Sequence, residues 1–437
     1  MKMIMVTAPS SGSGKTLVTL GIIRALKKKG MNICGYKTGP DYIDTKFLGK
    51  ASGKRPGNLD IHLMGVDGIK KAIAMGEGEY AVVEGAMGYF DGIYNTFENS
   101  SFQISNKLDI NSILVYTPKG EMFSAIPKIK GMVDFEGSKI KGVILNKVNK
   151  SMYMLLKSQI EKYIGIKVLG FIEEDKDLEI ESRHLGLIQT EELENIEHTI
   201  EKASTLIEEN IDIEEIIKLM KEVKTPRFIY PEKRNIKIAI AYDKAFSFYY
   251  MENLKLLEKT CNVEYFSPLE DEKLPICDLV YIGGGYPEIF KDELSKNKSM
   301  LISIRDFVEK DGYIYGESGG FLYLLENIEG SKMCNVFKGN GTMTDKLERF
   351  GYINVKLLKD CILGRKGDIL TGHEFHKTTV DIDDKDIYNI TKPMSKKTWR
   401  CGHVYKNVLG GYPHINFLGN MESFNWLMGK VEKSRER

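Results

Sequence analysis

MIMVTAPSSGSGKTLVTLGIIRALKKKG, residues 3–30, is the stretch that decides the fold of the first half of the chain. Residues 3–8 are apolar except for Thr7 and predict a buried strand, and the apolar positions of residues 16–30 recur at helical spacing. The glycine-rich turn between them ends in Gly-Lys-Thr. Backbone N–H groups bind phosphate where a strand enters such a turn and a helix leaves it. The stretch therefore predicts a nucleotide-binding α/β domain.

The residues of this turn have distinct expected roles. We expect the backbone of Gly12, Ser13 and Gly14 to surround the phosphates of ATP. The Lys15 ammonium would reach the terminal phosphates, and the Thr16 hydroxyl would bind Mg²⁺. ATP and Mg²⁺ are therefore the expected nucleotide and metal.

The first 190 residues continue as an α/β domain with a parallel sheet. Short apolar runs alternate with helical segments, which is typical of strands buried on both faces. The further expected strands lie within residues 32–38, 80–87, 110–118, 139–148 and 166–172.

Polar residues lie at or just after the ends of three of these expected strands. Carboxyl ends of parallel strands meet at one edge of a sheet, beside the phosphate site. Asp41 and Glu84 are therefore predicted partners of Mg²⁺, directly or through water. Asn146 follows a later strand, where contact with the nucleobase and helix capping are equally good accounts.

The second half has a different beginning and a second α/β pattern. Residues 191–234 are acidic, lysine-rich and helical in pattern, which predicts a helical connector that ends at a proline-punctuated turn. Residues 235–437 again alternate strands and helices, and they predict a separate domain.

Three motifs of this second domain belong together. They are YIGGGYPE at residues 281–288, YIYGESGGFLYL at residues 313–324 and GGYPHINF at residues 410–417. The middle motif predicts a sharp turn from a strand into a helix, because Gly316, Gly319 and Gly320 surround Ser318 and leave room for a strained backbone.

The trio resembles a class I glutamine amidotransferase domain, which is a flavodoxin-like α/β fold. Together with the first domain, it resembles the cobyrinate a,c-diamide synthase family, which joins a dethiobiotin-synthetase-like ATPase domain to a glutamine amidotransferase domain. The resemblance spans nearly the whole chain and rests on a series of motifs in the family's order: SSGSGKT, GYKTGPDYID, NLDIHLM, EGAMGYFDG, GVILNKV, RHLGL, AYDKAFSFYY, FSPLED, YIGGGYPE, GHEFH and PHINF.

The resemblance implies a ligase that amidates the a and c side-chain carboxylates of cobyrinate in cobalamin biosynthesis. ATP would convert each carboxylate to an acyl phosphate, and ammonia from glutamine or from solution would displace phosphate. Asp41, Tyr42 and Asp44 match the family's loop that binds ATP and positions the acid substrate. Hydrogenobyrinate or nickel sirohydrochlorin are alternative substrates. A diverged P-loop ATPase that does not amidate is the alternative function.

The resemblance also assigns roles in the second domain. Ser318 stands where the family has its cysteine nucleophile, and His414 matches its base. Asn416 would orient the imidazole of His414 without bringing a negative charge. The oxyanion hole would consist of backbone N–H groups, those of Gly284, Gly285 and Gly319.

Serine in place of cysteine leaves three interpretations open. An alcohol ionises far less readily than a thiol, whose pKa is about 8.5, so a glutaminase of little or no activity is favoured. The other two are a serine introduced in place of a natural cysteine and a working serine amidase. GESGG also fits the GxSxG pattern of serine hydrolases, but a hydrolase does not explain the phosphate loop.

Composition limits the kinds of partner. The 437 residues carry 62 basic and 61 acidic side chains, a net charge of +1 that indicates neither nucleic acid nor a membrane surface. No apolar run approaches the roughly 20 residues of a membrane helix, and the N-terminus does not resemble a signal peptide. The six cysteines form no CxxC pair. We therefore expect a cytoplasmic protein with reduced thiols, and its oligomeric state stays open, with a homodimer as one option.

Overall fold

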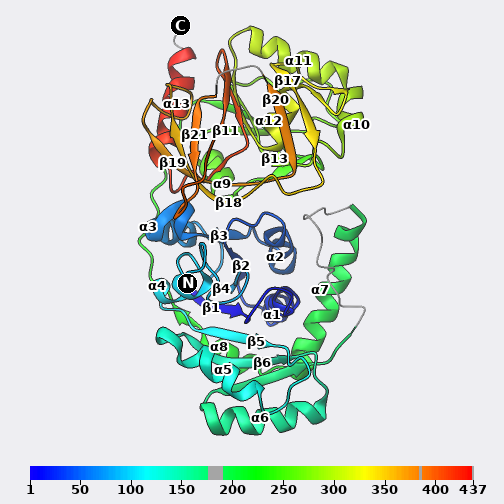
Figure 1. Ribbon diagram of the computed structural model, residues 1–437, viewed down its shortest axis with the longest axis vertical. Coiled ribbons are helices and arrows are strands. Elements are labelled where there is room, and N and C mark those ends of the chain that lie inside the picture. The colour runs from blue at the N-terminus through cyan, green and yellow to red at the C-terminus, as the bar shows by residue number, and fades with distance from the viewer. Residues whose placement is uncertain (176–189, 383–385, 436–437) are drawn as a thin grey trace. The chain divides into compact units, whose positions relative to one another are not determined.

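Figure 1 shows the protein as a computed structural model that describes residues 1–175, 190–382 and 386–435. Contacts divide the chain into two compact units. The first comprises Met1–Ile61 and Val66–Phe228, and the second comprises His62–Gly65 and Ile229–Arg437. The RHLGL motif at residues 183–187 lies outside the described residues. In the part of the chain that the structure describes, no helix is long and apolar enough to cross a membrane.

A parallel sheet forms the centre of the first unit, with strand order β3-β2-β4-β1-β5-β6-β7. The short β8 pairs antiparallel with β1, where Lys2 lies opposite Glu222. The strands are β1 (Lys2–Thr7), β2 (Ile33–Thr38), β3 (Gly57–Leu59), β4 (Tyr80–Glu84), β5 (Ser112–Tyr116), β6 (Ile140–Asn146), β7 (Lys167–Ile172) and β8 (Lys221–Glu222). The helices are α1 (Lys15–Lys28), α2 (Asp44–Ser52), α3 (Ile61–Ala74), α4 (Ser101–Leu108), α5 (Ala125–Asp134), α6 (Lys150–Ile164), α7 (Thr190–Asn210) and α8 (Ile213–Leu219), with a 3₁₀ turn at Phe135–Gly137.

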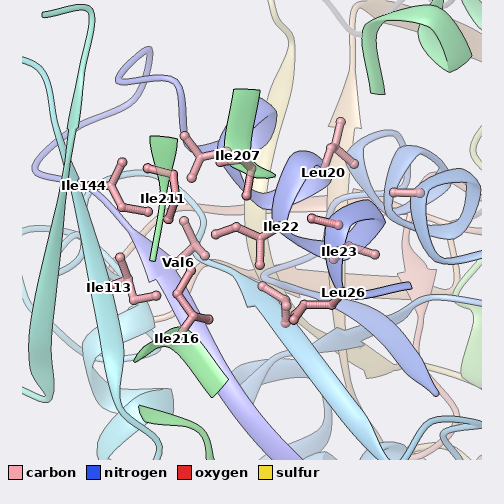
Figure 2. Packing of buried hydrophobic residues seen from close by; sticks show 14 of the residues in the cluster. Val6, Leu20, Ile22, Ile23, Leu26, Ile113, Ile144, Ile207, Ile211 and Ile216 are labelled. Carbon is pink, nitrogen blue, oxygen red and sulfur yellow. The ribbon is translucent and has the colours of Figure 1, made fainter. Parts of the chain in front are cut away.

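The core of this unit explains why its strands are apolar along nearly their whole length. Side chains from β1, α1, β5, β6, α7 and α8 pack into one cluster, part of which Figure 2 shows. Val6, Ile113 and Ile144 come from the sheet, and Leu20 and Ile22 come from α1. Strands covered in this way need apolar residues on successive positions, as the sequence pattern predicts.

The structure divides the chain differently from the predicted connector at residues 191–234. Most of this segment is helical, as expected, but α7 and α8 pack onto the first unit, which extends through Phe228. α7 lies so close to α1 that a Cβ on Gly21 would lie 2.8 Å from Ile207. The Arg24 guanidinium on α1 pairs with Glu197 at 2.7 Å and also with Glu201. The acidic residues therefore serve a helix–helix contact within the first unit.

A six-stranded sheet in the second unit has the order β11-β9-β12-β14-β24-β23, parallel except for the β23–β24 pair. Its strands are β9 (Lys237–Ala241), β11 (Asn262–Phe266), β12 (Leu279–Ile282), β14 (Tyr313–Glu317), β23 (His403–Tyr405) and β24 (Val408–Gly411). The helices of this unit are α9 (Met251–Thr260), α10 (Lys291–Lys296), α11 (Lys298–Glu309), α12 (Gly319–Leu324) and α13 (Met421–Arg435).

Shorter sheets complete the second unit. β10 (Phe246–Phe248) pairs with β13 (Gly284–Gly285), and a four-stranded sheet has the order β16-β15-β17-β20. An antiparallel sheet of order β22-β21-β18-β19-β25 brings His373 opposite His414. Its strands and those of the four-stranded sheet are β15 (Leu325–Ile328), β16 (Ser331–Lys332), β17 (Phe337–Met343), β18 (Arg349–Leu357), β19 (Ile369–His376), β20 (Thr378–Ile382), β21 (Tyr388–Thr391), β22 (Thr398–Cys401) and β25 (His414–Ile415). The predicted α/β class is confirmed for both units.

Candidate functional site

The phosphate loop of the first unit joins β1 to α1 through left-handed backbone. Gly12 has φ 72°, and Gly14, which precedes the first turn of α1, has φ 83° and ψ 13°. Such φ values favour glycine. No side chain in the described part of the chain caps the N-terminus of α1. The first N–H groups of α1 therefore remain available to an anion, as the sequence predicts.

Asn146, the last residue of β6, supports this loop by hydrogen bonding to its backbone. Its Nδ2 donates to the carbonyl of Ser13 at 3.2 Å, and Thr117 Oγ1 donates to the same oxygen at 3.3 Å. A Cβ on Gly14 would lie 2.3 Å from Asn146 Nδ2, so only glycine fits there. Among the described residues, the side chain that caps the following helix α6 is that of Asn149, so Asn146 supports the loop instead, and its contact with the nucleobase stays a prediction.

Buried charges gather beside the loop. Thr16 Oγ1 donates to Glu84 Oε1 at 2.6 Å, and Lys37 Nζ donates to the same oxygen at 2.8 Å. Lys37 Nζ also donates to Asp44 Oδ2 at 2.6 Å. The sequence reasoning missed Lys37, although it stands at the end of an expected strand within GYKTGPDYID. That position at the carboxyl edge of the sheet is the signal that could have found it.

The pKa shifts in this cluster follow from burial and from mutual attraction. Burial, with a smaller contribution from Lys37, lowers the pKa of Lys15 to about 8. Burial alone would also lower the pKa of Lys37, but the charges of Asp44 and Glu84 outweigh it and raise that pKa. Burial raises the pKa of Glu84. Lys37 is therefore a fixed cation, whereas Lys15 titrates near the physiological range.

Asp41 has a structural task that competes with its predicted one. Its Oδ1 accepts hydrogen bonds from the backbone N–H groups of Ile43 and Asp44, at 2.8 and 3.0 Å. It thereby organises the turn into α2, and Tyr42 lies half-buried within that turn. Burial and the neighbouring Asp44 raise the pKa of Asp41 to about 7. Its roles toward Mg²⁺ and substrate stay predictions.

Ser318 forms the expected elbow between β14 and α12. Its backbone has φ 49° and ψ −106°, a conformation that costs strain for any residue with a side chain. The Ser318 N–H donates to the carbonyl of Gly411 at 2.7 Å, and the Gly320 N–H donates to that of Gly283 at 2.9 Å. A Cβ on Gly320 would lie 2.1 Å from the carbonyl oxygen of Ile282. The elbow therefore depends on close backbone approach.

The structure brings the three glycines of the predicted oxyanion hole together with His414. A Cβ on Gly319 would lie 2.9 Å from the backbone nitrogen of Gly285. A Cβ on Gly284 would lie 2.4 Å from His414 Cε1 and 3.0 Å from Nε2. The Cε1–Nε2 edge of the imidazole thus faces Gly284, in the loop of three glycines at residues 283–285, which we call the glycine loop.

Asn416, the residue predicted to orient His414, has its side-chain oxygen bound to the backbone, and its role toward His414 stays a prediction. Its Oδ1 accepts from the Leu418 N–H at 2.9 Å, and its carbonyl accepts from Asn420 at 2.8 Å. These bonds fix the turn after β25. Glu317 stands beside the imidazole, with Oε2 3.8 Å from His414 Nδ1. The sequence reasoning missed Glu317, although it directly precedes Ser318.

Both units match known domain families. Residues 4–188 match the CobQ/CobB/MinD/ParA nucleotide binding domain, and residues 237–421 match the CobB/CobQ-like glutamine amidotransferase domain. The chain therefore contains the predicted P-loop ATPase domain followed by an amidotransferase-like domain.

Three relatives that match over nearly their whole length are cobyrinate a,c-diamide synthases. The chain is 44% identical to cobyrinate a,c-diamide synthase of Clostridium tetani, over 98% of this chain and 100% of that protein. It is 43% identical to the synthase of Clostridium acetobutylicum, with the same coverage. It is also 38% identical to the synthase of Methanocaldococcus jannaschii, over 96% of this chain and 97% of that protein.

Proposed function

We infer the function from the premise that this chain belongs to the cobyrinate a,c-diamide synthase family. We propose that it uses ATP to amidate the a and c side-chain carboxylates of cobyrinate. The observation that carries this proposal is the arrangement of two lysines, Lys15 and Lys37, with Thr16 and Glu84 at the open N-terminus of α1. Such an arrangement suits phosphoryl transfer, in which positioning and charge stabilisation supply most of the catalysis.

The proposed reaction has two steps at the first unit. A carboxylate oxygen of the substrate attacks the γ-phosphorus of ATP, which forms an acyl phosphate and releases ADP. Ammonia then attacks the acyl carbon, phosphate leaves and the amide loses a proton to solvent. The Lys15 ammonium and the N–H groups of α1 would stabilise the charge that develops on the phosphates. Asp41, Tyr42 and Asp44 are the residues that we propose to position the acid.

The residues present fit Mg²⁺. Glu84 is fully buried, and among the described residues its Oε2 has no hydrogen-bond partner. A hard oxygen ligand in this state, next to the Thr16 hydroxyl, suits a small cation. We propose that Thr16 and Glu84, with Asp41 as a further ligand, hold Mg²⁺, which would neutralise charge on the nucleotide phosphates. No trio of His, Cys, Asp or Glu side chains within the described ranges is arranged to hold a metal, so the phosphates and water would complete the coordination.

The nitrogen source depends on the second unit. We propose that free ammonia supports the reaction and that glutamine supports it poorly, because Ser318 replaces the usual thiol. We further propose that the enzyme works in the cytoplasm without nucleic acid. Light scattering would tell whether it is a homodimer.

The experiment that tests the proposal compares nitrogen donors and acids. Purified protein with ATP and Mg²⁺ is incubated with cobyrinate and either ammonium or glutamine, and ADP and the amides are measured by chromatography and mass spectrometry. Hydrogenobyrinate and nickel sirohydrochlorin serve as alternative acids. We expect ADP and the diamide with cobyrinate and ammonium. No ADP formation with any tetrapyrrole acid would contradict the synthase and favour a P-loop ATPase that does not amidate.

A further inference from the structure

The imidazole of His414 lies between two different environments. Its Cε1–Nε2 edge faces Gly284 in the glycine loop, and its Nδ1 faces the Oε2 of Glu317 at 3.8 Å. That distance exceeds a hydrogen bond, as is common for catalytic pairs before substrate binds. A general base of this kind needs its proton on Nδ1 and its lone pair on Nε2. The question is which group keeps the proton on Nδ1.

Glu317 is held as an acceptor. Tyr281 donates its hydroxyl to Oε2 at 2.7 Å, and Tyr315 donates to Oε1 at 2.7 Å. The Ile415 N–H donates to Oε1 at 3.0 Å. Burial raises the pKa values of both tyrosines well above their usual range, so both hydroxyls keep the protons that they donate. The fully buried Glu317 side chain thus receives three donors, and both of its oxygens act as acceptors.

Asn416, His373 and His376 lie near His414, but none of them offers a negatively charged acceptor. Asn416 uses Oδ1 for the Leu418 N–H, and its remaining Nδ2 is a donor that has no partner in the described part of the chain. A donor cannot accept the Nδ1 proton. His373, opposite His414 on β19, has its pKa lowered to about 3 by burial and stays neutral. Burial likewise lowers the pKa of His376 to about 4.

We propose that Glu317 is the residue that positions His414, by accepting the Nδ1 proton and leaving Nε2 free for the nucleophile. The inference rests on the proposed amidotransferase role of the second unit. In that role, the Ser318 hydroxyl proton passes to Nε2 while Oγ bonds to the amide carbon of glutamine. The carbonyl electron pair moves onto the oxygen, which the glycine N–H groups stabilise. Ammonia then leaves with the proton from Nε2.

The tautomer of His414 tests this proposal without ATP, glutamine or turnover. Two-bond ¹⁵N–¹H correlation spectra of protein with ¹⁵N-labelled histidine distinguish the two neutral tautomers, and the His414→Gln variant identifies the signal. We expect the Nδ1–H tautomer in the native protein. In Glu317→Gln the new amide keeps its oxygen toward the Ile415 N–H and turns its NH₂ toward His414, which favours the Nε2–H tautomer. Asn416→Ala is the matched control and should leave the tautomer unchanged.

Each outcome decides the proposal. An Nε2–H tautomer in the native protein overturns it even if Glu317→Gln does not fold. An unchanged tautomer in a folded Glu317→Gln variant, or a change in Asn416→Ala alone, also overturns it. In a Ser318→Cys background, we expect Glu317→Gln to lower glutamine-dependent kcat about a hundredfold or more, with the ammonia-dependent rate unchanged. Loss of the ammonia-dependent rate in the native protein would instead count against the synthase and leave the tautomer result intact.

Discussion

The two units use one structural device for different purposes. In each, a parallel strand ends in a left-handed turn that leads into a helix. The turn at Gly14 has no side chain, so what it presents at the start of α1 is backbone N–H groups, which suit an anion. The turn at Ser318 carries a side chain at φ 49° and bears strain to present it. The comparison teaches that a turn which binds through its backbone depends on glycine, whereas an elbow such as that of Ser318 depends on the small residues around the side chain that it presents.

The largest effect should follow from removing the Lys15 ammonium from the phosphate loop. We expect Lys15→Ala to lower kcat for ammonia-dependent amidation at least about a hundredfold, because charge on the phosphates is no longer neutralised. ADP release in the presence of cobyrinate measures it. Lys29→Ala, an exposed lysine just beyond the same helix, is the control and should behave like the native protein. Retained turnover in Lys15→Ala would refute the proposed ATP site.

Lys37 tests whether the cluster beside this site is structural as well as catalytic. Lys37→Met leaves Glu84 and Asp44 without their buried cation, so we expect a loss of roughly 3 kcal/mol in the free energy of unfolding. Denaturant titration measures it. Adding Glu84→Gln should restore part of the stability, because one uncompensated charge is removed, without restoring amidation. Additive effects of the two substitutions would show that the pair is not coupled.

Substitutions at Ser318 should change glutamine-dependent amidation and leave ammonia-dependent amidation unaffected. We expect Ser318→Cys to raise glutamine-dependent amidation on the order of tenfold, because a thiolate forms far more readily than an alkoxide. The ammonia-dependent rate should stay the same. Ser318→Ala is the matching variant. If it abolishes glutamine use in the otherwise unaltered protein, the serine is a working nucleophile and the comparison between the units must be revised.

The smallest expected effect is a pH dependence of kcat/KM for ATP, which Lys15 in the phosphate loop would cause. The pKa of Lys15 is lowered to about 8, so the ammonium is charged below that pH and becomes neutral above it. A polyanion binds the charged form better, so kcat/KM for ATP should fall about tenfold per pH unit above pH 8, as expected for loss of one proton. A profile that stays flat to pH 10 would contradict the assignment of Lys15. If Lys15→Arg retains activity, its kcat/KM for ATP should not fall above pH 8, since arginine stays charged.

Much of both sites could be predicted because their motifs are local. The phosphate loop is one short stretch that contains Gly12, Gly14, Lys15 and Thr16. A strand before it and a helix after it determine how these residues are placed. Ser318 and its glycines follow the same logic. What could not be predicted are partnerships between distant segments. Lys37 joins Asp44 to Glu84 across strands, and Asn146 reaches Ser13 from β6.

The sequence by itself determined the α/β class, the phosphate loop and the elbow, because short-range backbone geometry and apolar periodicity decide these features. The tertiary structure alone decided that the acidic helix α7 belongs to the first unit, where Ile207 packs against Gly21. It also decided that Glu317 stands beside His414, with its Oε2 3.8 Å from Nδ1. Which carboxylate or amide faces an imidazole depends on how separate strands align in a sheet, and no spacing along the chain specifies that alignment.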